Sequence, residues 1–382
     1  MKHKHSKPSC KDASMLPKIE CAETVTSTFD RHGKLWTVWT RSGHLYLQSS
    51  TDKGQTFSPA VTVNRTPEDV RARGENRPKI KIDGDDNIYL TWTNSLGKRF
   101  TSNIRFTRST DGGKSFSEPV TINDDNKIIG HAFDSLAIGQ DGEVFITWLD
   151  SRDTHAAKDK GEEYIGSSLY YSWSDDNGES FTANKKIGSH TCQCCRLQTA
   201  IDKDNTPVVV WRHIFEGGIR DHALIKFKDW DTAGEVTRIS HENWKIDACP
   251  HHGTGLSIAK EGRYHSVWFS NSETHQGLFY GYSVDEGKTF SAPINFAKQG
   301  AGNPHVLAIG EKVYIAWQQF DGTNTLAKLM RSTDAGVTWS EAETITQVAS
   351  DKVDRPFLIE DANQAYLSWQ VPNQNYQLKA IY

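Results

Sequence analysis

Residues 109–116 read Ser109-Thr110-Asp111-Gly112-Gly113-Lys114-Ser115-Phe116, and this stretch decides the fold class. Its aspartate is suited to accept backbone hydrogen bonds across a turn, and its second glycine to adopt the left-handed conformation that such a turn requires. The aromatic residue is expected to pack beneath the turn. Four further copies of the pattern occur, at 50–57, 174–181, 283–290 and 332–339. The chain is therefore built from a repeated unit that ends in the same turn.

A strand with a tryptophan near its end accompanies this turn and recurs seven times. One copy is Val144-Phe-Ile-Thr-Trp148, and successive tryptophans are 49 to 63 residues apart. This period is close to the length of a four-stranded propeller blade. We therefore predict an all-β protein, a β-propeller of four-stranded blades, with seven blades preferred and six as the alternative. The recurring tryptophans are Trp39, Trp92, Trp148, Trp211, Trp268, Trp317 and Trp369.

The repeated turn is the Asp-box, and the chain from about residue 21 to its end resembles the BNR/Asp-box repeat family, whose best-known members are the sialidases. The resemblance implies a single β-propeller domain over residues 21–382. Residues 1–20 are expected to form a tail that could supply a closing strand near residues 15–20. Sialidases have six blades, which keeps the six-bladed alternative open. Because Asp-boxes occur in propellers of many kinds, the resemblance says little about function.

Charge and composition argue against several kinds of partner. The formal net charge is -4 and no dense run of lysine and arginine occurs, so nucleic acid is not an expected partner. No apolar run approaches the roughly 18 residues that a membrane span needs. The first residues carry no hydrophobic leader segment. We interpret the chain as an exported protein, periplasmic or secreted, whose signal peptide is absent from the given sequence.

Three of the six cysteines lie in the stretch Thr191-Cys192-Gln193-Cys194-Cys195-Arg196. A second stretch, Asp247-Ala248-Cys249-Pro250-His251-His252-Gly253, follows 57 residues later and places cysteine and two histidines at the same offsets. Thiol and imidazole donors at matching positions of successive repeats predict a soft-metal site. The first strand of each propeller blade lines the central channel, so these positions should meet at one channel mouth. The preceding blade would add His131.

The identity of the metal follows from the donor types. Side chains two apart on an extended strand share a face, so Cys195 and His252 should point away from the other donors unless the backbone bends. Thiolates with imidazoles favour copper(I), zinc or iron over magnesium or calcium. We predict copper, with four-coordinate zinc as the alternative. The predicted metal ligands are Cys192, Cys194, Cys195, Cys249, His251, His252 and His131.

The same cysteines permit a structural alternative. In an oxidising compartment Cys192 could pair with Cys249, or Cys194 and Cys195 could form a vicinal disulfide. The chain would then be a disulfide-stapled binding propeller without chemistry.

The resemblance to sialidases implies a further alternative, a glycoside hydrolase. Sialidases bind the substrate carboxylate with three arginines at the channel mouth, and Arg77, Arg196 and Arg355 could form such a clamp. The family's Arg-Ile-Pro motif is absent from the first blade, and no Tyr/Glu nucleophile pair is recognisable. The residues predicted to anchor a substrate or to support the metal ligands are Arg77, Arg196, Arg212, Asp134, His305 and Arg355.

Together these patterns predict an exported metal-binding propeller with a Cys/His site at one channel mouth. We expect it to act in copper handling or as a copper-dependent redox enzyme on a small substrate. Its expected partners are the metal ion and a small anionic or carbohydrate ligand.

Overall fold

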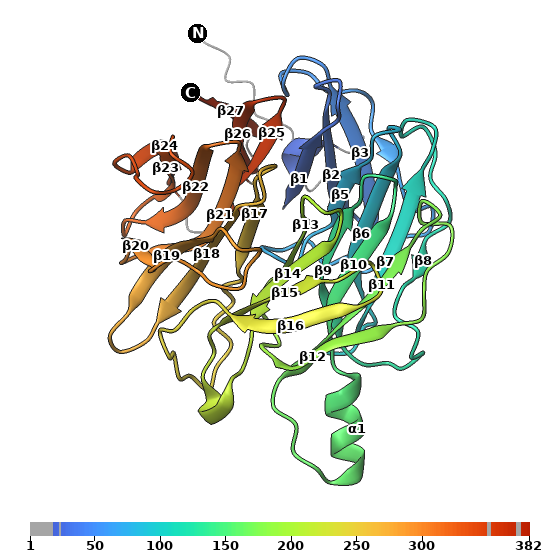
Figure 1. The fold of residues 1–382 in the computed structure, drawn as a ribbon. Coiled ribbons are helices and arrows are strands. Elements are labelled where there is room, and N and C mark those ends of the chain that lie inside the picture. Colours follow the sequence, from blue (N-terminus) through green and yellow to red (C-terminus); the bar gives the residue numbers. More distant parts are fainter. Residues whose placement is uncertain (1–17, 23, 350–352, 372–375) are drawn as a thin grey trace.

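The computed structural model describes residues 18–22, 24–349, 353–371 and 376–382, whose strands form seven antiparallel sheets arranged around a central axis (Figure 1). Within these residues six sheets have four strands and the seventh has three. The fold is a seven-bladed β-propeller, so the preferred blade number is confirmed.

The strands follow the chain blade by blade. Blade 1 contains β1 (Val25–Phe29), β2 (Leu35–Arg41), β3 (His44–Ser50) and β4 (Val61–Thr62), and blade 2 contains β5 (Lys79–Ile82), β6 (Ile88–Ser95), β7 (Ser102–Ser109) and β8 (Val120–Thr121). Blade 3 contains β9 (His131–Ile138), β10 (Val144–Asp150), β11 (Ser167–Ser174) and β12 (Lys185–Thr191), and blade 4 contains β13 (Gln198–Ile201), β14 (Pro207–Arg212), β15 (His222–Phe227) and β16 (Ala233–Arg238). Blade 5 contains β17 (Gly255–Ile258), β18 (Tyr264–Asn271), β19 (Gln276–Ser283) and β20 (Ile294–Ala297), and blade 6 contains β21 (Ala301–Ile309), β22 (Lys312–Phe320), β23 (Thr325–Ser332) and β24 (Glu343–Val348). Blade 7 contains β25 (Phe357–Asp361), β26 (Gln364–Trp369) and β27 (Gln377–Ile381).

The innermost strands form a closed ring around the channel. Each of them contacts the innermost strand of the next blade, and β25 of blade 7 contacts β1 of blade 1. Hydrogen bonds join the first part of the chain to blade 7. Ser27 Oγ donates to Ser368 Oγ over 2.8 Å, and Gln370 Nε2 donates to the Ala22 carbonyl over 3.2 Å. Of the closing strand predicted near residues 15–20, residues 15–17 lie outside the described residues. Residues Ile19–Cys21 form a short 3-10 helix, η1, instead of a strand.

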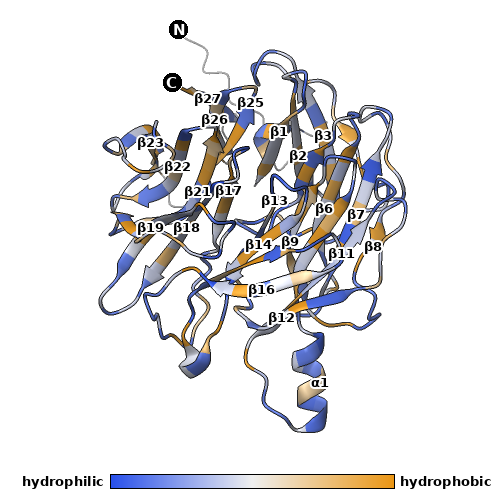
Figure 2. Ribbon diagram, viewed as in Figure 1, coloured by the Kyte–Doolittle hydropathy of each residue, from blue (hydrophilic) through white to orange (hydrophobic). Residues whose placement is uncertain are grey.

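The recurring tryptophans form the core between blades. All seven are buried, with at most 1% of each residue exposed. Hydrophobic residues concentrate along the strands, whereas loops and the helix are mostly hydrophilic (Figure 2). Each large ring fills the space between neighbouring sheets, which explains why the residue recurs with the period of the blade.

The Asp-box turns have the geometry that their sequence predicts. In residues 109–116, Asp111 Oδ1 accepts the backbone N–H groups of Lys114 and Ser115, each over 2.9 Å. Ser109 Oγ accepts the N–H of Gly113, whose φ is +79°. The hydroxyl and backbone N–H of Ser115 lower the pKa of Asp111 to about 2. The turn is therefore fixed by local hydrogen bonds, and this explains how it can recur in different blades.

One end of the ring carries the longer insertions. Helix α1 (Arg152–Lys160) leaves the end of β10 and projects away from the blades (Figure 1). A second short 3-10 helix, η2 (Glu216–Gly218), lies in the β14–β15 connection. Residue Ser167, at the start of β11, pairs with Thr191, at the end of β12, so the cysteine stretch begins at the same edge as α1. Among the described residues, no helix is long and apolar enough to cross a membrane.

Candidate functional site

The first cysteine stretch forms a turn between β12 and β13. Cys192 Sγ lies 3.3 Å from Cys195 Sγ and 3.9 Å from Cys194 Sγ. The expectation that Cys195 points away from the other two holds only for an extended strand. Here residues 193–195 turn and β13 starts only at Gln198, so all three sulfurs converge. This trio of Cys192, Cys194 and Cys195, called the thiol cluster below, could hold a metal ion.

The thiol cluster is enclosed by protein. The three cysteines are 1%, 7% and 2% exposed, and the ring of Phe133 packs against them. All three are free of disulfides, as is Cys249. The disulfide alternatives for these residues are therefore not formed in this structure.

Two arginines give the thiol cluster a positive surrounding. Arg220 Nη1 donates to Cys192 Sγ over 3.3 Å, and the Arg212 carbonyl accepts the Cys192 N–H over 3.0 Å. The thiols of Cys194 and Cys195 lower the pKa of Cys192, burial opposes this effect, and the charges of Arg212 and Arg220 reinforce it. Hydrogen bonding to Cys192 raises the pKa of Cys194, and burial raises that of Cys195. A thiolate at Cys192 is thus stabilised, and thiolates are the form that binds metals.

The second stretch lies in the connection between β16 and β17. Cys249 and His251 are exposed, and neither belongs to the group of ligand atoms around Cys192. His252 is partly buried and stacks on Phe269 with ring centroids 4.1 Å apart. Burial lowers the pKa of His252 to about 4, with Glu75 opposing and Arg212 contributing. The imidazole is therefore neutral near pH 7, and a metal-ligating role for these residues stays a prediction.

The channel mouth beside the thiol cluster contains a cavity of about 170 Å³ lined by arginines and carboxylates. Arg77 forms a two-pronged ion pair with the buried Asp354, with one contact of 3.0 Å between Nη1 and Oδ2. Burial raises the pKa of Asp354 to about 6, and Arg77 opposes this shift. The first arginine of the predicted clamp is therefore neutralised by a carboxylate of the protein itself.

The other two clamp arginines share one carboxylate. Glu75 Oε2 lies 3.3 Å from Arg355 Nη1, and Glu75 Oε1 lies 3.8 Å from Arg196 Nε. The N–H of Gly253 also donates to Glu75 over 3.1 Å. Although burial opposes ionisation, Arg196 and Arg355 hold the pKa of Glu75 below its usual value. The structure thus brings the three predicted arginines to one mouth, together with two internal counter-ions.

The remaining predicted residues divide between the mouth and the blade interior. Asp134 accepts hydrogen bonds from Thr91 Oγ1 over 2.7 Å and from Lys79 Nζ over 3.4 Å. His305 lines the cavity, and burial lowers its pKa to about 3. Arg212 donates to backbone carbonyls, including that of Phe269 over 2.7 Å, and does not line the cavity. It also donates to the carbonyl of Arg220, the residue whose side chain reaches Cys192.

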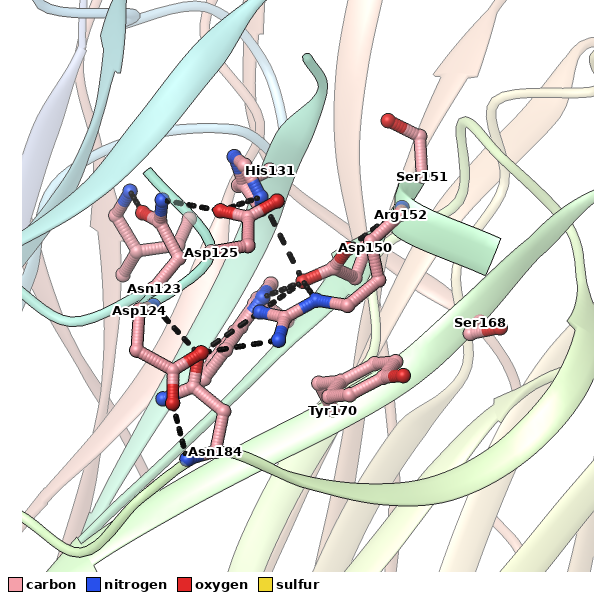
Figure 3. Close-up of polar contacts among 12 residues, drawn as sticks. Asn123, Asp124, Asp125, His131, Asp150, Ser151, Arg152, Ser168, Tyr170 and Asn184 are labelled. Atoms are coloured by element: carbon pink, nitrogen blue, oxygen red, sulfur yellow. Dashed lines mark hydrogen bonds and ion pairs between the residues drawn. The ribbon is translucent and has the colours of Figure 1, made fainter. Parts of the chain in front are cut away.

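His131 lies in a different group from the cysteines. Its Nε2 faces Asp125 Oδ1 at 3.2 Å and Asp150 Oδ2 at 3.7 Å (Figure 3). These three residues form the second group of possible metal ligands among the described residues. The sequence aligned His131 with the cysteine stretches by counting residues along the chain. In the structure its ring turns toward the segment after β8, so it is grouped with Asp125 and Asp150 and not with the three cysteines.

Sequence reasoning did not single out Arg220, Asp354 or Asp125 as site residues. Each lies in a connection between strands, where the repeat has no fixed length and alignment by offset fails. The available signal for Asp354 was its adjacency to the predicted Arg355. For Arg220 and Asp125 no signal in the sequence distinguishes them from other charged loop residues.

The closed ring of seven blades defines the chain as a β-propeller with Asp-box turns. No protein-family model and no curated protein sequence matches it. Similar solved structures include a protein of unknown function from Dyadobacter fermentans, 15% identical over 84% of this chain and 96% of that chain, with a TM-score of 0.54. A Hadza microbial sialidase is 13% identical over 91% and 73%, with a TM-score of 0.55. An ulvan lyase is 10% identical over 93% and 90%, with a TM-score of 0.59. At these identities the likeness establishes the fold alone.

Proposed function

We propose that this protein binds copper(I) through the thiol cluster and acts in copper handling. The observation that carries the proposal is the convergence of three buried sulfurs beside two arginines. Thiolates select copper(I), zinc and iron-sulfur centres over harder ions. Because all three sulfurs are almost wholly buried, the site suits holding an ion more than exposing it to a substrate.

Charge favours copper(I) over zinc at these residues. Three thiolates with one copper(I) ion carry two negative charges, and Arg212 and Arg220 supply two positive charges. Burying ions without such compensation is costly. A zinc ion usually takes four ligands, and the thiol cluster offers three. The second stretch would have to supply the fourth, from Cys249, His251 or His252.

Export to the periplasm or the cell exterior is part of the proposal. Cys21 is disulfide-bonded, and disulfides persist mainly in oxidising compartments. Copper handling outside the cytosol would place the protein where its cargo arrives.

A competition titration tests the proposed function. Protein purified without a tag under anaerobic conditions is titrated with copper(I) against a chromophoric chelator. We expect stoichiometric binding that Cys194→Ser weakens by at least about 100-fold, since one of three ligands is lost. Gln193→Ala, an exposed change in the same turn, is the matched control and should bind like the wild type. Equal affinity in Cys194→Ser and Gln193→Ala would refute the proposal.

A second candidate function is favoured by the cavity at the channel mouth. Arg77, Arg196 and Arg355 meet there, and an acidic saccharide is the class of ligand that such a group recognises. Their pairing with Glu75 and Asp354 counts against a free clamp, because a substrate carboxylate would have to displace an internal one. Hydrolysis of a fluorogenic sialoside, lost in Arg355→Gln, would support this candidate; the absence of turnover would leave copper handling.

A further inference from the structure

Asp125, His131 and Asp150 form a buried cluster, called the Asp-His-Asp cluster below (Figure 3). Asp125 follows β8, His131 begins β9 and Asp150 ends β10. The side chains of His131 and Asp150 are 0% exposed, and that of Asp125 is 8% exposed. The cluster contains none of the sulfurs of the thiol cluster, so it is a separate feature of the molecule.

The ring of His131 is oriented by a backbone group. Its Nδ1 lies 2.7 Å from the carbonyl oxygen of Ser102, and a carbonyl can only accept, so Nδ1 carries the proton. In the neutral ring Nε2 then presents a lone pair toward the two carboxylates. This arrangement, with one ring nitrogen bound to a carbonyl and the other facing acidic oxygens, is the usual support for a metal-ligating histidine.

The contacts of Nε2 have the spacing of metal ligands and lack the geometry of hydrogen bonds. His131 Nε2 is buried and makes no hydrogen bond, and neither does Oδ2 of Asp125. The distances of 3.2 Å and 3.7 Å from Nε2 to the carboxylate oxygens bracket the value of about 3.4 Å between neighbouring ligands of a tetrahedral ion with bonds of about 2.1 Å. A buried polar atom without a hydrogen bond is costly unless something occupies the space between the groups.

The surrounding charges call for a cation. Asp124, Asp125 and Asp150 supply three negative charges, and Arg152 supplies one positive charge through contacts of 3.0 Å with Asp124 and 2.9 Å with Asp150. Among these four side chains two negative charges remain, which one divalent cation would balance. The hydrogen bond of 2.8 Å from Trp148 Nε1 to Asp150 Oδ2 orients this carboxylate from behind.

We propose that the Asp-His-Asp cluster is a binding site for a divalent cation of the zinc or manganese class. Two carboxylates and one imidazole suit these borderline ions and not copper(I), which prefers sulfur. The ion would link the segment after β8 to the facing ends of β9 and β10, directly before α1. It would therefore act as a structural staple at the root of the helix. The proposal does not depend on copper binding at the thiol cluster.

Manganese provides the cleanest probe, because it has low affinity for thiolates. Metal-stripped full-length protein is titrated with Mn²⁺, and the free ion is counted by electron paramagnetic resonance. We expect stoichiometric binding that Zn²⁺ displaces, and the same stoichiometry in Cys194→Ser. Substituting a residue that only supports the metal ligands lowers affinity roughly 10- to 100-fold. Asp125→Asn removes a ligand itself, so its affinity for Mn²⁺ should fall by more than this. Glu118→Gln, which removes a 76% exposed carboxylate just before β8, is the control and should still bind the ion.

A measurement on the wild type guards against misfolded variants. The ¹⁵N resonances of His131 report whether its ring is neutral or an imidazolium at neutral pH. We expect the Nε2 resonance to shift when Zn²⁺ is added and to report a ring without a proton on Nε2 in the bound state. An imidazolium that ignores Zn²⁺, with Mn²⁺ left free in the titration, would overturn the proposal, because the proton would then lie between the two carboxylates. Binding that survives unchanged in Asp125→Asn would overturn it as well.

Discussion

Arg220 donates a hydrogen bond to Cys192 Sγ over 3.3 Å, across 28 residues of chain. The contact joins the β14–β15 connection to the turn before β13. A loop of blade 4 therefore reaches the thiol cluster, which lies just before the innermost strand of the same blade. A guanidinium beside a buried sulfur stabilises the thiolate without adding a donor atom. Two residues outside the cysteine stretches, Arg212 and Arg220, therefore contribute to the electrostatic environment of the cluster.

We expect Arg220→Gln to weaken copper(I) binding while all three sulfurs remain. A hydrogen bond to a charged group contributes about 1.5–3 kcal/mol, so the affinity should fall about 10- to 100-fold. The chelator competition described above measures it. Arg65→Gln removes an exposed arginine with an 81% exposed side chain and should leave the affinity unchanged. An Arg220→Gln protein with wild-type affinity would show that the guanidinium does not act on the thiolate.

Glu75→Gln should destabilise the propeller because it leaves Arg196 and Arg355 without their counter-ion. Breaking a buried ion pair by removing one partner costs about 3 kcal/mol or more. Urea unfolding followed by tryptophan fluorescence reports this loss. Added acetate should restore part of the stability, since a free carboxylate can occupy the vacated position. In contrast, Glu118→Gln, on a 76% exposed side chain, is expected to change nothing.

The two glycines of one Asp-box offer a matched pair of substitutions. A Cβ added at Gly113 would lie 2.8 Å from Leu47 and 3.0 Å from Trp36, whereas at Gly112 nothing lies within 4 Å. Both have positive φ, which costs about 1–2 kcal/mol for alanine. Overpacking adds about 1–3 kcal/mol at Gly113 alone. The thermal unfolding temperature should be highest for the wild type, lower for Gly112→Ala and lowest for Gly113→Ala. Equal decreases in the two variants would contradict the packing argument.

Acid should destabilise the fold through the Asp-box aspartates. The folded-state pKa of Asp111 is about 2, below its ordinary value of 3.8, so its contribution to stability is fully present above about pH 4 and is lost as the pH falls through about 2. We expect the free energy of unfolding to fall between about pH 4 and pH 2, and to fall less steeply in Asp111→Asn. An identical slope in the two proteins would show that this aspartate is not linked to folding. The other four box aspartates, with the same low pKa, are Asp52, Asp176, Asp285 and Asp334.

The candidate site could be predicted only in part. Adjacent donors in one short stretch, Cys192, Cys194 and Cys195, stay close whatever the fold does, so their grouping was visible in the sequence. The alignment of His131 with them rested on counting residues back from the inner strands. The segments before those strands are loops whose lengths differ, so equal offsets do not imply equal positions.

The sequence by itself determined the repeated blade and favoured seven copies of it, because Asp-boxes close through hydrogen bonds within eight residues and each tryptophan recurs once per blade. Only the tertiary structure decided which groups share a site. It turned the chain at Cys194, brought Arg220 to the sulfurs, and placed Asp125 and Asp150 beside His131. The physical reason is that a turn is encoded in neighbouring residues, whereas contacts between loops depend on how whole blades pack around the channel.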